Sequence, residues 1–159
     1  MKINNVSFVL AAAAALLLNT PVVKASDDMA MMEPVKSVYD QYLKIQAELA
    51  QDSMKGISDQ AKAIAEAVKG DKMKMLPTDV ATEAESLAKA KDLATARESF
   101  KALSDSLIKY LTDNKVHSGT YTQVYCPMAN ANWLQSGKDV SNPYLGKSMP
   151  TCGEIKQTF

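Results

Sequence analysis

Apolar residues recur at alternating spacings of three and four along the sequence that follows Pro34. The first run consists of Val35, Val38, Tyr42, Ile45 and Leu49. Because an α-helix has about 3.6 residues per turn, this spacing places all these side chains on one face of a helix. Pro34 suits the first turn of a helix, and Gly56 interrupts the pattern. The sequence therefore predicts a first helix of about 18 residues that begins near Pro34.

The same spacing predicts three further helices. The inward face of the second, which ends at Gly70, consists of Ile57, Ala61, Ile64 and Val68. The inward face of the third consists of Val80, Ala84 and Leu87. The fourth begins after the N-cap Asp92, and its apolar face consists of Leu93, Ala96, Phe100, Leu103, Leu107 and Leu111. Four amphipathic helices with short connections predict an all-α fold, an antiparallel up-down four-helix bundle over residues 35–114.

The helical pattern ends near Asn114. Beyond it, the sequence indicates one short extended piece, from Tyr121 to Tyr125, and Pro and Gly then mark a series of turns. Aromatic side chains bury large areas, so Tyr125, Trp133 and Tyr144 are the expected anchors of this region. We expect residues 115–159 to form an ordered but irregular cap packed on the bundle.

The N-terminus has the features of a secretory signal peptide over residues 1–25. Its apolar run, Val6 to Leu18, is shorter than the roughly 20 residues of a membrane-spanning helix. Small residues place the expected cleavage after Ala25. A flexible, Met-rich N-terminus over residues 26–34 follows, and no membrane association is expected after cleavage. We expect an exported protein of the bacterial periplasm, which is an oxidising compartment.

The charge composition excludes several classes of function. Lys and Arg number 18, Asp and Glu also number 18, and the formal net charge is zero, so nucleic-acid binding has no electrostatic support. The single His, His117, cannot supply a three-His zinc site or a two-His iron triad within one chain. Its neighbour Ser118 is adjacent only in sequence, which does not make a catalytic dyad. We therefore expect a protein that is not an enzyme.

Two pairs of sulfur-containing residues lie in the cap. Cys126 and Met128 share one proline-containing turn, and Met149 and Cys152 share another. Thiolates and thioethers are soft ligands that select Cu(I), Ag(I) or other soft cations over Mg²⁺ and Ca²⁺. If the two turns face each other, four sulfur atoms converge, and His117 could add a nitrogen. The sequence thus predicts a soft-metal site, with Cu(I) as its first candidate.

The same two cysteines have an alternative interpretation as a disulfide. Two Cys residues in an exported domain are commonly paired. A bond between Cys126 and Cys152 would stabilise the fold by about 3.5 kcal/mol in the chain-entropy model. Met128 and Met149 would then fill gaps in the core. The spacing alone leaves both interpretations open.

A second group of methionines follows the expected cleavage position. Met29, Met31 and Met32 lie beside acidic residues and are a weaker candidate site for collecting Cu(I). The alternative is that this segment is only a frayed N-terminal tail. Met32 and His117 also lie in places where some exported bundles hold haem. No covalent haem-attachment motif is present, so haem would be bound non-covalently.

Several segments carry a resemblance to a known family. Those in the cap are Tyr125-Cys-Pro-Met-Ala129, Trp133-Leu-Gln135, Asn142-Pro-Tyr-Leu-Gly-Lys147, Ser148-Met149 and Cys152-Gly-Glu154. Those in the helices are Tyr42-Leu43, Leu49-Ala50, Asp52, Ala96-Arg97, Phe100 and Leu103-Ser104. Through them the chain resembles a bacterial family of uncharacterised exported helical domains. That family occurs alone or fused to periplasmic adaptor subunits of copper/silver and other heavy-metal efflux pumps.

The resemblance implies that the protein handles soft heavy metals, above all copper, through Cys126, Met128, Met149 and Cys152. We expect a periplasmic carrier, buffer or delivery module for heavy-metal homeostasis or efflux. Its expected partners are the metal ion and an adaptor or other subunit of an efflux system. The alternative is a disulfide-stapled helical domain that binds a protein and no metal.

Overall fold

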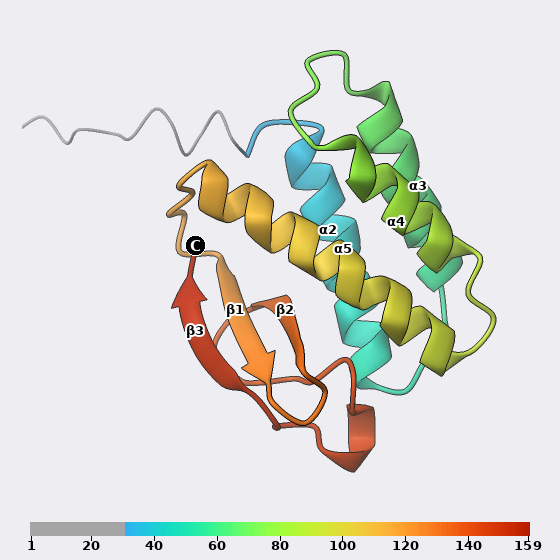
Figure 1. Ribbon diagram of the computed structural model, residues 1–159, viewed down its shortest axis with the longest axis vertical. Helices are drawn as coiled ribbons and strands as arrows, with labels where there is room; N and C mark the ends of the chain where they lie inside the picture. The colour runs from blue at the N-terminus through green and yellow to red at the C-terminus, as the bar shows by residue number, and fades with distance from the viewer. Residues whose placement is uncertain (1–30) are drawn as a thin grey trace, which may run out of the picture.

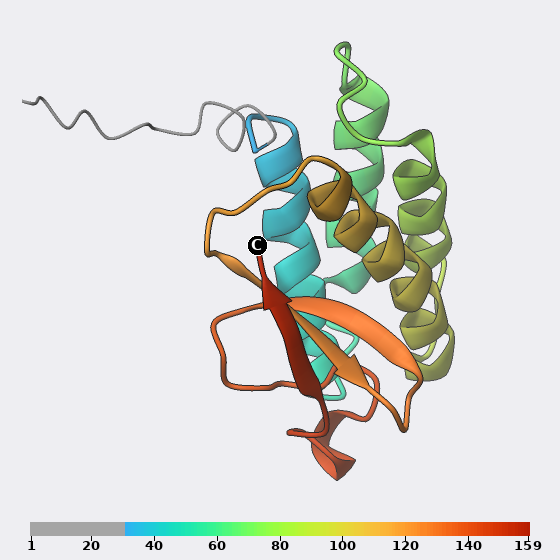
Figure 2. The ribbon, with the colours of Figure 1, turned by 60° about the vertical axis from the view of Figure 1, so that its left-hand side comes forward.

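The computed structural model of the protein describes residues 31–159, in which four helices precede a small sheet. The helices are α2 (Val35–Ala50), α3 (Ile57–Gly70), α4 (Thr78–Ala88) and α5 (Leu93–Asp113). The strands are β1 (Tyr121–Cys126), β2 (Ala131–Ser136) and β3 (Glu154–Thr158), and a 3₁₀ helix, η1 (Gly146–Ser148), precedes β3. Figures 1 and 2 show the sheet beside α2 and α5, with α3 and α4 on the far side of these helices.

The four helices are those that the sequence predicts. Every apolar residue predicted to face inward is buried except Leu93, which is half-buried. Asp92 caps α5 as predicted, because its carboxylate accepts a hydrogen bond from the N–H of Thr95 at 2.8 Å. The first helix, α2, has 16 residues, and Pro34 precedes it as the N-cap. Each large aliphatic side chain buried in this way stabilises the fold by about 1.5–3 kcal/mol.

Two buried tyrosines of α2 connect the helices to one another. The hydroxyl of Tyr39 donates to the carbonyl oxygen of Leu107 on α5 at 2.7 Å. The ring of Tyr42 stacks on Phe100 of α5, with 4.8 Å between the ring centroids. Its hydroxyl lies 2.7 Å from the hydroxyl of Ser104, also on α5. These contacts give the polar tips of two large core side chains their hydrogen-bond partners.

Helices that are neighbours in the chain are also neighbours in space. α2 packs on α3, α3 on α4 and α4 on α5. The tyrosine contacts then join α5 to α2. The four predicted helices are therefore confirmed, whereas their arrangement as an up-down bundle stays a prediction.

The C-terminal region is not the irregular cap that the sequence predicts. It contains a three-stranded antiparallel sheet with the strand order β2-β1-β3. β1 includes the extended piece predicted from Tyr121 to Tyr125, but β2 and β3 have no counterpart in the sequence prediction. The fold is mostly helical with a small sheet, and residues of both parts share one hydrophobic cluster.

The two missed strands lack the alternation by which strands are recognised. In β2, Trp133, Leu134 and Gln135 are buried in succession. In β3, every residue is exposed. Their extended conformation depends on hydrogen-bond pairing with β1, which a local hydrophobic pattern does not report.

In the part of the chain that the structure describes, no helix is long and apolar enough to cross a membrane. The predicted signal peptide, residues 1–25, and Met29 lie outside the described residues.

Candidate metal centre

Cys126 is the last residue of β1, at the start of a hairpin turn. β1 and β2 pair in register from Tyr121 opposite Ser136 to Cys126 opposite Ala131. The turn between them consists of residues 127–130. Asn130 closes the turn with a φ of 46°, a left-handed conformation that Asn tolerates well. The Cys-Pro-Met segment is therefore the tip of a β-hairpin.

Cys152 lies on a second turn, immediately before β3. Its N–H donates to the carbonyl oxygen of Met149 at 3.2 Å. β3 starts at Glu154, which pairs with Tyr125 on β1, the residue next to Cys126. The register of the sheet thus brings both turns to the same end of β1.

The two cysteine sulfur atoms are in contact. The Sγ atoms of Cys126 and Cys152 are 2.9 Å apart, and both residues are free thiols. Cys126 is fully buried, whereas Cys152 is partly exposed to solvent. The two turns thus face each other at the thiols, an arrangement that both the metal site and the disulfide require.

Hydrogen bonds converge on the sulfur of Cys126. Burial raises the pKa of this thiol, but the hydrogen bonds outweigh burial and leave the pKa below the ordinary cysteine value. The donors are the Cys152 thiol, the backbone N–H groups of Ala129 and Met128, and the Asn142 amide. The pKa of Cys152 is raised, first by its hydrogen bond to Cys126 and then by burial. The donors on the hairpin turn therefore favour a negative charge on the sulfur of Cys126.

Asn142 holds the loop that carries Cys152. This residue is fully buried, and its amide nitrogen donates to the carbonyl oxygen of Cys152 at 2.6 Å. Its backbone N–H donates to the carbonyl oxygen of Pro150 at 2.8 Å. Its side-chain oxygen accepts from the N–H groups of Tyr144 and Leu145 at 2.8 and 2.9 Å. One side chain thus fixes the turn of Cys152 and also reaches Cys126.

Gly153 lets the second turn lie flat against the core. A Cβ at this position would lie 2.7 Å from the indole atom Cη2 of Trp133 and 2.7 Å from Cγ1 of Val124. Any other residue would therefore push the turn away from β1 and the hairpin. The contact between the two thiols depends on this close approach.

An ion pair anchors the segment between β2 and β3 to the helices. The Arg97 guanidinium on α5 donates to Asp52 at 2.6 Å and to the carbonyl oxygen of Pro143 at 2.8 Å. The other carboxylate oxygen of Asp52 accepts from the N–H of Lys147 at 3.1 Å. The hydrogen bond from Arg97, followed by that from Lys147, holds the pKa of Asp52 below its ordinary value. The loop before Cys152 is thereby tied to the ends of α2 and α5.

The two methionines of the sulfur pairs lie on the two turns. Met128 is on the hairpin turn and 68% exposed, and Met149 is on the turn of Cys152 and 39% exposed. The structure brings their turns together through the cysteine contact. Convergence of the two thioethers on the thiols stays a prediction.

The structure does not bring His117 to the cysteines. His117 lines a small pocket with Gln157 and Phe159, at the end of the sheet where β1 begins. Cys126 lies at the other end of β1, roughly 16 Å further along the strand. The nitrogen that His117 was expected to add is thus remote from the thiols in this arrangement.

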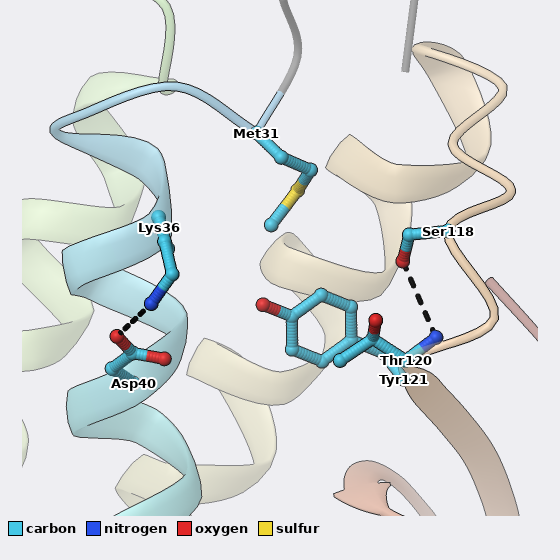
Figure 3. Close-up of a pocket in the computed structure, with 6 residues that line it drawn as sticks. All are labelled: Met31, Lys36, Asp40, Ser118, Thr120 and Tyr121. Atoms are coloured by element: carbon cyan, nitrogen blue, oxygen red, sulfur yellow. Dashed lines mark hydrogen bonds and ion pairs between the residues drawn. The ribbon is translucent and has the colours of Figure 1, made fainter. Parts of the chain in front are cut away.

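Met31 and Met32 also lie away from the cysteines, at the start of α2. Met31 lines a pocket with Tyr121, the first residue of β1, beside the ion pair of Lys36 and Asp40 (Figure 3). Met32 is 58% exposed. Among the described residues, no group of three or more His, Cys, Asp and Glu side chains could hold a metal ion. The candidate centre therefore has two thiols, and the thioethers carried by the same two turns are the remaining candidate soft donors.

Sequence reasoning identified the cysteines but missed Asn142 and Gly153 as residues that position them. In the sequence, Asn142 stands out only as part of a segment that carries the family resemblance. Its reach to Cys152 and Cys126 depends on how the segment folds back on β1, and no local pattern signals this.

Comparison with known proteins places the helical part of the chain in a family. A family model described as "Protein of unknown function (DUF3347)" matches residues 38–119. No curated protein and no solved structure matches the chain. The match ends before β1 and does not include the cysteines. Since it spans half of the sequence, the chain belongs to the DUF3347 family.

Proposed function

We propose that the protein binds a soft metal ion, Cu(I) above all, and acts as a carrier, buffer or delivery module in the bacterial periplasm. The observation that carries this proposal is the pair of free thiols whose Sγ atoms lie 2.9 Å apart. Thiolates are the protein ligands that select Cu(I) and other soft cations. Export, inferred from the N-terminal sequence, would bring this pair to the compartment where such ions are handled.

The spacing of the thiols suits an ion with little rearrangement. With a metal–thiolate bond of about 2.3 Å, as for zinc, a tetrahedral ion separates two sulfurs by roughly 3.8 Å. The turns of Cys126 and Cys152 would have to part by about 1 Å from their present 2.9 Å contact. Cys152 lies on a turn outside the strands, so a shift of this size on its side leaves the strand pairing intact.

The hydrogen bonds at Cys126 prepare one ligand in advance. A thiol must lose its proton to bind a metal, so binding releases protons and depends on pH. The N–H groups of the hairpin turn already stabilise a negative charge on Cys126. Cys152 gives up its proton when the ion arrives. Met128 and Met149 are exposed on the same turns and supply neutral soft donors that can take part in transfer to a partner.

Delivery to an efflux system is supported by the resemblance of the cap to domains fused to periplasmic adaptor subunits. The partly exposed Cys152 allows an incoming ligand to reach the ion from outside. Ligand exchange between the two proteins then moves the ion without any change in the rest of the fold.

A second candidate function is a disulfide-stapled interaction domain that binds no metal. The same 2.9 Å contact favours it, since bond formation needs the sulfurs to approach by about 0.9 Å, to about 2.05 Å. A thiol count on protein taken directly from the periplasm separates the two functions. A pair that stays oxidised under all cellular conditions supports the staple.

Metal binding is tested with reduced protein titrated anaerobically with Cu(I) against a chromophoric Cu(I) chelator. We expect one tightly bound ion per chain and sulfur coordination by X-ray absorption. The double variant Cys126→Ser/Cys152→Ser should lose at least about 100-fold in affinity, or roughly 2.7 kcal/mol. Met128→Leu and Met149→Leu should each lose about tenfold or less.

His117→Ala is the matched control, and it should bind Cu(I) as the unsubstituted protein does. Stoichiometric tight binding by the double cysteine variant would refute the proposed site. Loss of binding in the His117 variant would also count against it, because that residue lies at the far end of the sheet.

A further inference from the structure

The two thiols of the candidate centre differ in their access to solvent. Cys126 is fully buried at the end of β1, beneath the turn that carries Cys152. Cys152 lies on that turn and is partly exposed. A large reagent such as a second protein can therefore reach only one of the two sulfur atoms.

We propose that Cys126 and Cys152 form a reversible disulfide that closes the metal site, and that thiol–disulfide exchange with a dithiol protein enters through Cys152. The proposal rests on the proposed function in one respect, since it takes the reduced pair to be the metal-binding form. The observations behind it are the 2.9 Å contact and the unequal exposure of the two sulfur atoms.

Reduction of the disulfide proceeds in two steps. A thiolate of the dithiol partner attacks Sγ of Cys152, the bond between Cys126 and Cys152 breaks, and Cys126 leaves as a thiolate. The partner is then joined to Cys152 by a mixed disulfide. The second thiolate of the partner then attacks the partner's sulfur in the mixed disulfide. This releases Cys152, which takes up a proton. The protein gains two electrons, and the partner becomes the disulfide.

The hairpin turn assists the first step. The sulfur that leaves carries a negative charge, and exchange is faster when this charge is stabilised. The N–H groups of Met128 and Ala129 and the Asn142 amide already lie at the Cys126 sulfur. The exposure of Cys152 and the donors at the Cys126 sulfur thus both favour attack on Cys152 with Cys126 as the leaving group.

The consequence is a site whose occupancy follows the redox state. An ion bound between the thiols prevents them from forming a bond, and a disulfide has no thiolate to offer an ion. Once the ion has dissociated, the partner in its disulfide form takes two electrons from the two thiols by the reverse exchange and so blocks recapture. Reduction by the dithiol form restores capture, and neither step requires movement of the bundle.

The test uses purified protein oxidised by glutathione disulfide and then equilibrated in a glutathione redox buffer. Acid quenching and alkylation preserve the mixed disulfides, and trypsin separates Cys126, in peptide 116–138, from Cys152, in peptide 148–156. We expect glutathione on peptide 148–156 in at least about tenfold excess over peptide 116–138. The single variant Cys126→Ser should form the mixed disulfide at least about tenfold faster than Cys152→Ser.

An excess of glutathione on peptide 116–138 would overturn the proposal. So would two free thiols per chain after treatment with glutathione disulfide, counted in denaturant. The result is independent of the proposed function, because Cu(I) binding is measured on protein reduced beforehand. Protein that binds Cu(I) but forms no disulfide refutes the exchange alone. Protein that exchanges but binds no Cu(I) refutes the metal site alone.

Discussion

Substituting Gly153 by Ala tests how the second turn is held against the core. The added Cβ would lie 2.7 Å from both Trp133 and Val124, whereas ordinary contacts begin at 3.4 Å. The Cβ and its neighbours must therefore separate by about 0.7 Å, the difference between these distances. Trp133 is fully buried, and its indole N–H donates to Gln135 at 3.1 Å, so the turn has to move rather than the ring.

Overpacking of this kind costs about 1–3 kcal/mol. We expect Gly153→Ala to lower the free energy of unfolding by that amount in urea titrations of reduced protein. Gly70→Ala is the matched control, because no atom lies within 4 Å of the Cβ it would add at the end of α3. That variant should keep the stability of the unsubstituted protein or gain up to about 1 kcal/mol. A Gly153 variant that unfolds within about 0.5 kcal/mol of the unsubstituted protein would refute the reasoning.

The same substitution separates the thiols. Since Gly153 follows Cys152 directly, the outward shift of the turn carries Cys152 away from Cys126 and from the donors around it. Bond formation needs the sulfurs to approach from 2.9 Å to about 2.05 Å, so we expect the disulfide to form at least about tenfold more slowly in Gly153→Ala. An unchanged rate of disulfide formation in a destabilised Gly153→Ala protein would show that the turn does not position the thiols.

Two further predictions concern the helices and their connection to the cap. Tyr42→Phe removes the acceptor of the buried Leu134 N–H and should lower the free energy of unfolding by about 1–3 kcal/mol in urea titrations. The control Tyr125→Phe removes a hydroxyl at the surface and should change this free energy by no more than about 0.5 kcal/mol. Equal effects of the two substitutions would refute the reasoning. Arg97 lowers the pKa of Asp52 below 3.8, so this carboxylate adds stability above that pH and loses it as the pH falls through the lowered pKa. The difference in melting temperature between the unsubstituted protein and Asp52→Asn should therefore shrink as the pH falls from 6 to 2.5. A difference that stays constant over this range would contradict the prediction.

The sequence by itself determined the helices. Their apolar residues recur with the period of the helix, and that period is a local property which needs no knowledge of distant contacts. The N-cap of α5 could also be predicted, because Asp92 and Thr95, whose N–H it accepts, are only three residues apart. The sequence also showed that thiols and thioethers, which are soft donors, stand close together on two turns of the cap.

The tertiary structure decided everything that joins residues far apart in the chain. Cys126 and Cys152 meet because β3 returns to pair with β1. β3 has no alternating hydrophobic pattern from which this pairing could be predicted. The same register separates His117 from the thiols, although it precedes Cys126 closely in sequence. Asn142 reaches both cysteines only after the loop has folded back on β1. A residue's type limits what it can bind, but the distance between two side chains depends on the path of the whole backbone between them.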